Sequence, residues 1–96
     1  MQLKDVKKIL TTRKKDLLQR GVKALAIFGS IARGEGTARS DIDILVDFDS
    51  KRGLFGFVDL KNYLEEILKT NVDLVTKNAL HPALKENILR EAKNVF

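Results

Sequence analysis

Two short polar motifs, separated by ten residues, each adjoin an apolar run of this chain. Gly29-Ser30 follows the apolar run at 24–28, and Asp41-Ile42-Asp43 opens a second run that continues to Phe48. Short apolar runs bounded by glycine or polar residues are typical of buried strands. A glycine at the end of a strand lets the backbone turn sharply, and the N–H groups of such a turn can bind phosphate. The sequence therefore predicts a phosphate-binding turn after one strand and a pair of carboxylates on the next.

The second run alternates between apolar and charged residues. Alternate side chains of a strand point to opposite faces, which puts Ile42, Ile44, Val46 and Phe48 on one face and Asp41, Asp43, Leu45 and Asp47 on the other. Asp41 and Asp43 then have side-chain bases about 6 to 7 Å apart, so that both can reach one cation. Asp73 has the same pattern, because Val72 and Leu74 flank it in a later apolar run. We expect these three acids to converge on one face of a sheet.

The available side chains restrict the kind of metal site. The chain has no cysteine and one histidine, so carboxylate oxygens are the expected ligands, and these favour Mg²⁺ or Mn²⁺. Asp-X-Asp alone could be a pair of turn acids, but its spacing from Gly29-Ser30 favours a site. We predict that Asp41, Asp43 and Asp73 are catalytic metal ligands and that Gly29 and Ser30 contact nucleotide phosphates. Arg33 either adds positive charge at the same phosphates or is an ordinary surface arginine.

Hydrophobic periodicity predicts a mixture of helices and strands. Helices are expected at 2–20, 55–69 and 82–94, a short helix from about 31–33, and strands at 23–28, 41–48 and 72–76. The predicted fold class is α/β (α+β), a small mixed sheet with helices packed on one face, and 1–96 is expected to be a single domain. The pairing direction of the first two strands stays open. The last helix is expected to bury Leu84, Ile88, Leu89 and Ala92.

The charge of the chain bears on its partners. Eighteen Lys and Arg against thirteen Asp and Glu give a net charge of +5, concentrated in the first predicted helix. A solvated helix face is favoured there, because no aromatic residues interleave to stack bases; binding of nucleic acid through this basic first helix is the weaker alternative. No apolar run is long enough to span a membrane, and no signal peptide is evident. We expect a cytoplasmic protein, with homo- and hetero-oligomers both open.

Three segments together resemble a known family. Gly29-Ser30-Ile31-Ala32-Arg33-Gly34, then Ser40-Asp41-Ile42-Asp43-Ile44-Leu45-Val46, then Val72-Asp73-Leu74-Val75-Thr76, closely resemble the minimal nucleotidyltransferases (MNT) of the DNA polymerase β-like superfamily. The resemblance covers about residues 22–95 and implies a nucleotidyltransferase fold similar to the polymerase β palm. It implies that Asp41 and Asp43 bind metal and that Ser30 contacts phosphate. Asp73 would bind metal and align or deprotonate the acceptor hydroxyl.

The resemblance also implies a function. Members of this kind are similar to the antitoxins of HEPN/MNT toxin–antitoxin pairs. It therefore implies a Mg²⁺-dependent protein adenylyltransferase that transfers AMP from ATP to a tyrosine of a partner HEPN ribonuclease toxin and so silences it. Two alternatives stay open at this point: an antitoxin that neutralises its toxin by binding alone, and nucleotidyl transfer to RNA.

Overall fold

The structure is a computed structural model that describes residues 1–36 and 41–96. Over these residues the order of elements is α1 (Leu3–Thr12), α2 (Lys14–Gln19), β1 (Val22–Phe28), α3 (Gly29–Ala32), β2 (Ile42–Phe48), the 3₁₀ turn η1 (Ser50–Arg52), α4 (Gly53–Leu68), β3 (Val72–Thr76), the 3₁₀ turn η2 (Lys77–Ala79), α5 (Pro82–Glu91) and β4 (Lys93–Asn94). In this part of the chain, each helix is too short or too polar to cross a lipid bilayer.

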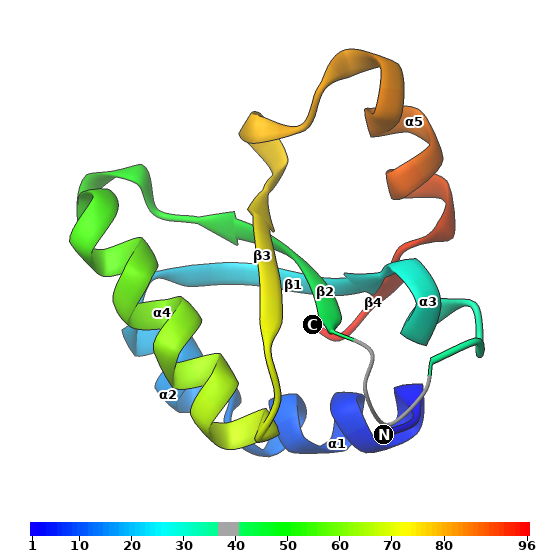
Figure 1. Cartoon of the computed structure of the whole chain (residues 1–96). Helices are drawn as coiled ribbons and strands as arrows, with labels where there is room; N and C mark the ends of the chain where they lie inside the picture. Colours follow the sequence, from blue (N-terminus) through cyan, green and yellow to red (C-terminus); the bar gives the residue numbers. More distant parts are fainter. Residues whose placement is uncertain (37–40) are drawn as a thin grey trace.

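The strands form one mixed sheet in the order β3-β2-β1-β4 (Figure 1). β1 pairs with β2 in antiparallel direction, which settles the pairing that the sequence left open. β2 pairs with β3 in parallel direction, because α4 carries the chain back to the starting end of the sheet. The predicted α/β class with a small mixed sheet is therefore confirmed.

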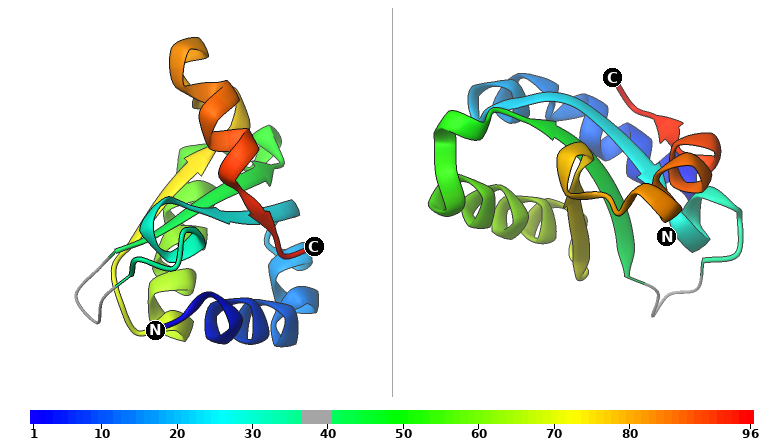
Figure 2. Two further views of the ribbon diagram at one scale, coloured as in Figure 1. Left: turned by 90° about the vertical axis from the view of Figure 1, so that its right-hand side faces the viewer. Right: turned by 90° about the horizontal axis from the view of Figure 1, so that it is seen from above.

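Three helices cover one face of this sheet. In the left view of Figure 2, α1 and α2 lie on one side of the strands and α5 lies on the other. α4 shares the core with α1 and α2 through Leu60, Leu64 and Leu68. The core between these layers includes the buried side chains Val6, Leu10, Leu17, Leu25, Ile27, Ile42, Ile44, Val46, Leu60, Leu64 and Leu68. The inward face of β2 is the one that the alternation of its sequence predicts. Packing of helices on this face leaves the opposite face to Asp43 and Asp73.

The first predicted helix is in fact two helices. Arg13 separates α1 from α2, and its N–H is shared between the carbonyl oxygens of Ile9 and Leu10 at 3.2 and 3.1 Å. A shared hydrogen bond of this kind tightens the last turn of a helix. No glycine or proline marks this break, so hydrophobic spacing alone predicted one continuous helix. The short helix after β1 also begins earlier than expected, at Gly29.

The C-terminal prediction was wrong in two respects. α5 ends at Glu91, and the next residues form β4 along the free edge of β1, where Val95 N–H donates to Leu25 O at 2.9 Å. In addition, α5 contains no buried residue: Leu84 and Leu89 are exposed, and Ile88 and Ala92 are half-buried. The unpaired edge of β1 favours a short strand, because its backbone groups need partners.

Candidate active site

The predicted acids meet at one end of the sheet. Asp43 of β2 and Asp73 of β3 are register partners in the parallel pair, so their side chains stand next to each other on the same face. Phe28, the last residue of β1, pairs with Asp43 from the other side. Asp41 is exposed directly before β2 begins. Sheet register thus brings Asp43 and Asp73 to the end of β1 where Gly29 follows, and Asp41 directly precedes β2 at the same end.

Asp43 is the most perturbed of these acids. Its pKa is raised above the ordinary value of 3.8, first by burial, then by the charges of Asp73 and Asp41, and also by a hydrogen bond that the protonated carboxyl donates to Asp73. The positive charge of Arg33 acts in the opposite direction and lowers this pKa. Asp43 therefore lies within electrostatic reach of both other acids, and a proton or a cation is needed to relieve the repulsion.

Gly29 is in direct contact with Asp43. Its φ is +71°, a conformation that side chains disfavour, and a Cβ at this position would overlap the Asp43 carboxylate. The glycine is therefore required for two reasons, and the turn after β1 is packed against the acid pair. Ser30 follows as a half-buried residue of α3. Gly29, Ser30 and Asp43 are consequently neighbours, as the motif spacing predicts.

Arg33, just after α3, is held by two carboxylates. Its Nε donates to Glu35 Oε2 at 3.0 Å, and its Nη1 donates to both carboxylate oxygens of Glu91 at 3.2 Å. These two acids raise the pKa of the guanidinium further. The positive charge of Arg33 also lowers the pKa of Asp43, which is compatible with the predicted role of Arg33 at the phosphates.

Glu91 is a residue of this site that the sequence did not indicate. Besides Arg33, its carboxylate accepts a hydrogen bond from Gly29 N–H at 2.8 Å, and 62 residues separate the two positions. The sequence places Glu91 within a predicted helix among other charged residues, and nothing local distinguishes it. Only the pairing of β4 with β1 brings the end of α5 to the turn at Gly29.

The donor set suits a hard divalent cation, although a cage is not preformed. Within 1–36 and 41–96, no group of three or more Asp, Glu, His or Cys side chains is arranged closely enough to hold a metal ion. What the structure brings together is the pair Asp43–Asp73, with Asp41 acting on Asp43 through its charge. Carboxylate oxygens and uncompensated negative charge at Asp43 match the preference of Mg²⁺ and Mn²⁺. Coordination by all three acids stays a prediction.

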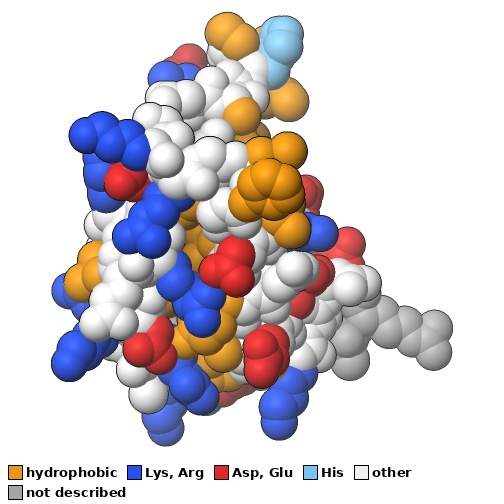
Figure 3. Space-filling view, turned by 90° about the vertical axis from the view of Figure 1, so that its left-hand side faces the viewer, with side chains coloured by type: hydrophobic (Ala, Val, Ile, Leu, Met, Phe, Trp, Pro, Cys, Tyr) orange, Lys and Arg blue, Asp and Glu red, His pale blue; other side chains and the backbone are white. Residues whose placement is uncertain are grey.

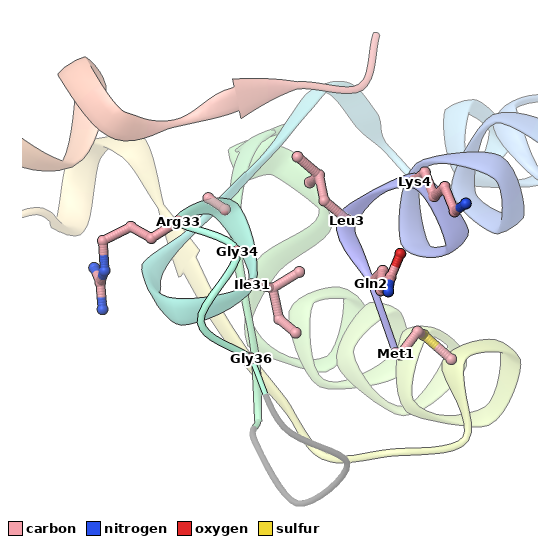
Figure 4. A pocket seen from close by; sticks show the side chains of 9 residues that line it. Met1, Gln2, Leu3, Lys4, Ile31, Arg33, Gly34 and Gly36 are labelled. Carbon is pink, nitrogen blue, oxygen red and sulfur yellow. The ribbon is translucent and has the colours of Figure 1, made fainter.

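A cavity of about 540 Å³ lies between the start of α1 and the segment from α3 to Gly36 (Figure 4). Its described lining includes Gln2, Lys4 and Ile31 and contains no Asp or Glu side chain. Figure 4 shows the side chain of Arg33 extending away from those of Gln2 and Ile31. The backbone at Arg33 and Gly34 also borders the cavity, but none of the three acids belongs to its described lining.

Comparison with known proteins agrees with this arrangement. The model of the nucleotidyltransferase domain family matches residues 3–95. The protein adenylyltransferase MntA of Thermococcus cleftensis is 44% identical over 92 residues, which cover 95% of this chain and 93% of that protein. A solved structure described as a candidate minimal nucleotidyltransferase has a TM-score of 0.83 and 37% identity, and the match covers 96% of this chain and 94% of the other.

A third match shows the fold alone. It is the complex described as a tri-AMPylated HEPN toxin of Shewanella oneidensis with its MNT antitoxin, with a TM-score of 0.65, 20% identity and coverage of 94% of this chain and 71% of that chain. A family match over nearly the whole chain and a 44% identical relative agree with the Gly-Ser and Asp-X-Asp geometry. The chain therefore belongs to the nucleotidyltransferase domain family.

Proposed function

We propose that this nucleotidyltransferase is a Mg²⁺-dependent protein adenylyltransferase of the antitoxin type. It transfers AMP from ATP to a tyrosine hydroxyl of a partner HEPN ribonuclease toxin. The observation that carries the proposal is the contact between Gly29 and Asp43, with Asp73 in register beside it. This contact joins a phosphate-binding turn to an acid pair. The 44% identical MntA, named as a protein adenylyltransferase, supports a protein acceptor.

The proposed chemistry is a single displacement at phosphorus. The tyrosine oxygen attacks the α-phosphorus of ATP, an O–P bond forms to AMP, and the bond to the leaving pyrophosphate breaks. Asp73 is suited to accept the hydroxyl proton, because it is exposed and lies next to Asp43. Gly29 N–H, Ser30 and Arg33 are the groups that would orient the phosphates. A divalent cation, when held by Asp41, Asp43 and Asp73, would neutralise phosphate charge.

The test is a transfer assay with the partner protein. The purified chain is mixed with ATP labelled in the α-phosphate, Mg²⁺ and, as the candidate partner, a HEPN protein from the same organism. We expect label on the partner and no label when its acceptor tyrosine is changed to Phe. An unlabelled partner, with the chain shown to be folded by circular dichroism, would contradict the proposal.

A second candidate function is neutralisation of the toxin by binding alone. The observation that favours it is an apolar surface at the start of α4, formed by Leu54, Phe55 and Val58, which are 73%, 90% and 45% exposed. Figure 3 shows hydrophobic side chains at the surface on the side of the molecule where α4 lies. Exposed apolar groups that gather in this way are typical of protein interfaces. If binding suffices, the chain with both Asp41→Asn and Asp43→Asn still neutralises the toxin at equal concentrations.

A further inference from the structure

The carboxylate of Glu91 accepts the hydrogen bonds that, among the described residues, join the end of α5 to the turn after β1. Gly29 N–H donates to its Oε1 at 2.8 Å, and Arg33 Nη1 donates to both of its oxygens at 3.2 Å. One backbone donor and one guanidinium from the same turn thus converge on a single anion. In Figure 1, α5 descends beside α3, which is how an acid near the C-terminus reaches this position.

These donors are the groups assigned to the nucleotide phosphates, so the inference rests on the proposed function. A backbone N–H makes one strong hydrogen bond at a time, so Gly29 N–H cannot donate to Glu91 and to a phosphate oxygen simultaneously. A carboxylate left beside a phosphate would also repel it. Binding of the turn to Glu91 and binding of the turn to phosphate are consequently mutually exclusive.

We propose that Glu91 is a built-in competitor for the nucleotide phosphates, and that ATP binds only when the Glu91 carboxylate swings out of the turn. Glu91 then sets the affinity for ATP. Ligands without phosphate, such as adenosine, are not in competition with it.

Glu91 can leave without disturbing the fold. Its side chain is 32% exposed, and no residue of α5 is fully buried, so rotation of the side chain toward solvent breaks its bonds to Gly29 and Arg33 but displaces no core side chain of α5. The backbone that follows is fixed, because Lys93 and Asn94 pair with β1. Arg33 also stays in place when Glu91 leaves, since Glu35 still accepts from its Nε at 3.0 Å. The displaced state therefore keeps its phosphate-binding groups positioned.

The first experiment measures binding of Mg²⁺–ATP and of adenosine to Glu91→Gln by calorimetry. Glutamine can still accept from Gly29 N–H but carries no charge. We expect its Kd for ATP to fall about tenfold, since hydrogen bonds to charged groups are the stronger ones, with adenosine binding unchanged. The matched control is Glu86→Gln, which removes the same charge from α5; Glu86 pairs with Arg90, at 2.7 Å, and its side chain is 81% exposed. The control should bind ATP like the wild type.

A second measurement needs no variant. In the wild-type chain, titration with tripolyphosphate should shift the NMR signals of the Gly29 amide and the Glu91 carboxyl carbon together, with one saturation curve. An ATP Kd for Glu91→Gln equal to or above the wild-type value, or a Glu91 signal that does not move at saturation, would overturn the inference.

The outcomes separate this inference from the proposed function. Transfer of AMP to the partner by the wild type, with an unchanged Kd for ATP in Glu91→Gln, would support the proposed function and contradict the competitor role of Glu91. Tighter ATP binding in Glu91→Gln without any transfer to the partner would support the competitor role of Glu91 and contradict the proposed function. If neither protein binds ATP or tripolyphosphate, both proposals fall.

Discussion

The carboxylate of Asp43 lies against the Cα of Gly29, in the space that a side-chain Cβ would occupy. The Gly-Ser and Asp-X-Asp motifs are therefore two halves of one contact, brought together by the antiparallel pairing of β1 and β2. Each half constrains the other. Changes at this contact should affect both stability and catalysis.

Replacement of Gly29 by Ala tests the contact directly. Gly34 provides a matched control, because its φ is +76° but no atom of residues 1–36 or 41–96 is found within 4 Å of a Cβ built there. Gly34→Ala should destabilise the chain by about 1 kcal/mol, the strain of a left-handed alanine. Gly29→Ala should cost about 1 to 3 kcal/mol more, because Asp43 must also move. Urea unfolding measures both, and equal losses would show that the close approach is unimportant.

Replacement of the site acids should reduce AMP transfer far more than replacement of another acid on the same strand. Asp41→Asn and Asp73→Asn should each reduce AMP transfer by at least about hundredfold, because each removes charge that the proposed reaction requires. Asp47→Asn is the control: Asp47 belongs to the same strand but lies four residues further along from Asp43, where it pairs with Ala24. It should transfer AMP at close to the wild-type rate. Similar losses in all three variants would indicate a general effect of charge.

The raised pKa of Asp43 predicts a pH-dependent gain in stability for Asp43→Asn. A carboxyl whose pKa rises on folding contributes stability that is present below its unfolded value, here 3.8, and is lost as the pH increases through the higher folded value. At pH 7 with a chelator, the folded wild type is destabilised by the ionised carboxylate of Asp43, whereas the Asn variant has no charge at this position. The variant should therefore have the higher Tm at pH 7 and a similar Tm at pH 3. A lower Tm for the variant at pH 7 would contradict the assignment.

The apolar surface on α4 predicts a loss of partner binding without a loss of stability. Phe55 is 90% exposed, so Phe55→Ser should change the free energy of unfolding by less than about 0.5 kcal/mol. Its Kd for the HEPN partner should rise by about tenfold, because exposed aromatic residues are common anchors of interfaces. Leu84→Ser removes an apolar side chain that is 57% exposed on α5 and serves as the control. An equal effect of both variants would mean that α4 has no special role.

The sequence by itself determined which faces of β2 and α4 are buried and on which face of β2 Asp43 lies. Alternation in β2 separates buried Ile42, Ile44 and Val46 from Asp43, and this depends only on the period of a strand. The apolar stripe of α4 likewise buries Leu60, Leu64 and Leu68, because its spacing matches a helix. Local periodicity suffices for these features, because the buried face of each element can be identified from the spacing of its own apolar residues.

Only the tertiary structure decided what surrounds these acids. The pairing of Asp43 with Asp73 depends on sheet register, and the bond from Gly29 to Glu91 joins residues 62 positions apart. The end of α5 at Glu91 depends on β4, which forms because β1 has a free edge. Such contacts arise from the meeting of distant segments, and periodicity within one segment carries no information about them. Sequence alone therefore gave the carboxylates and the glycine turn, whereas the fold placed Glu91 among them.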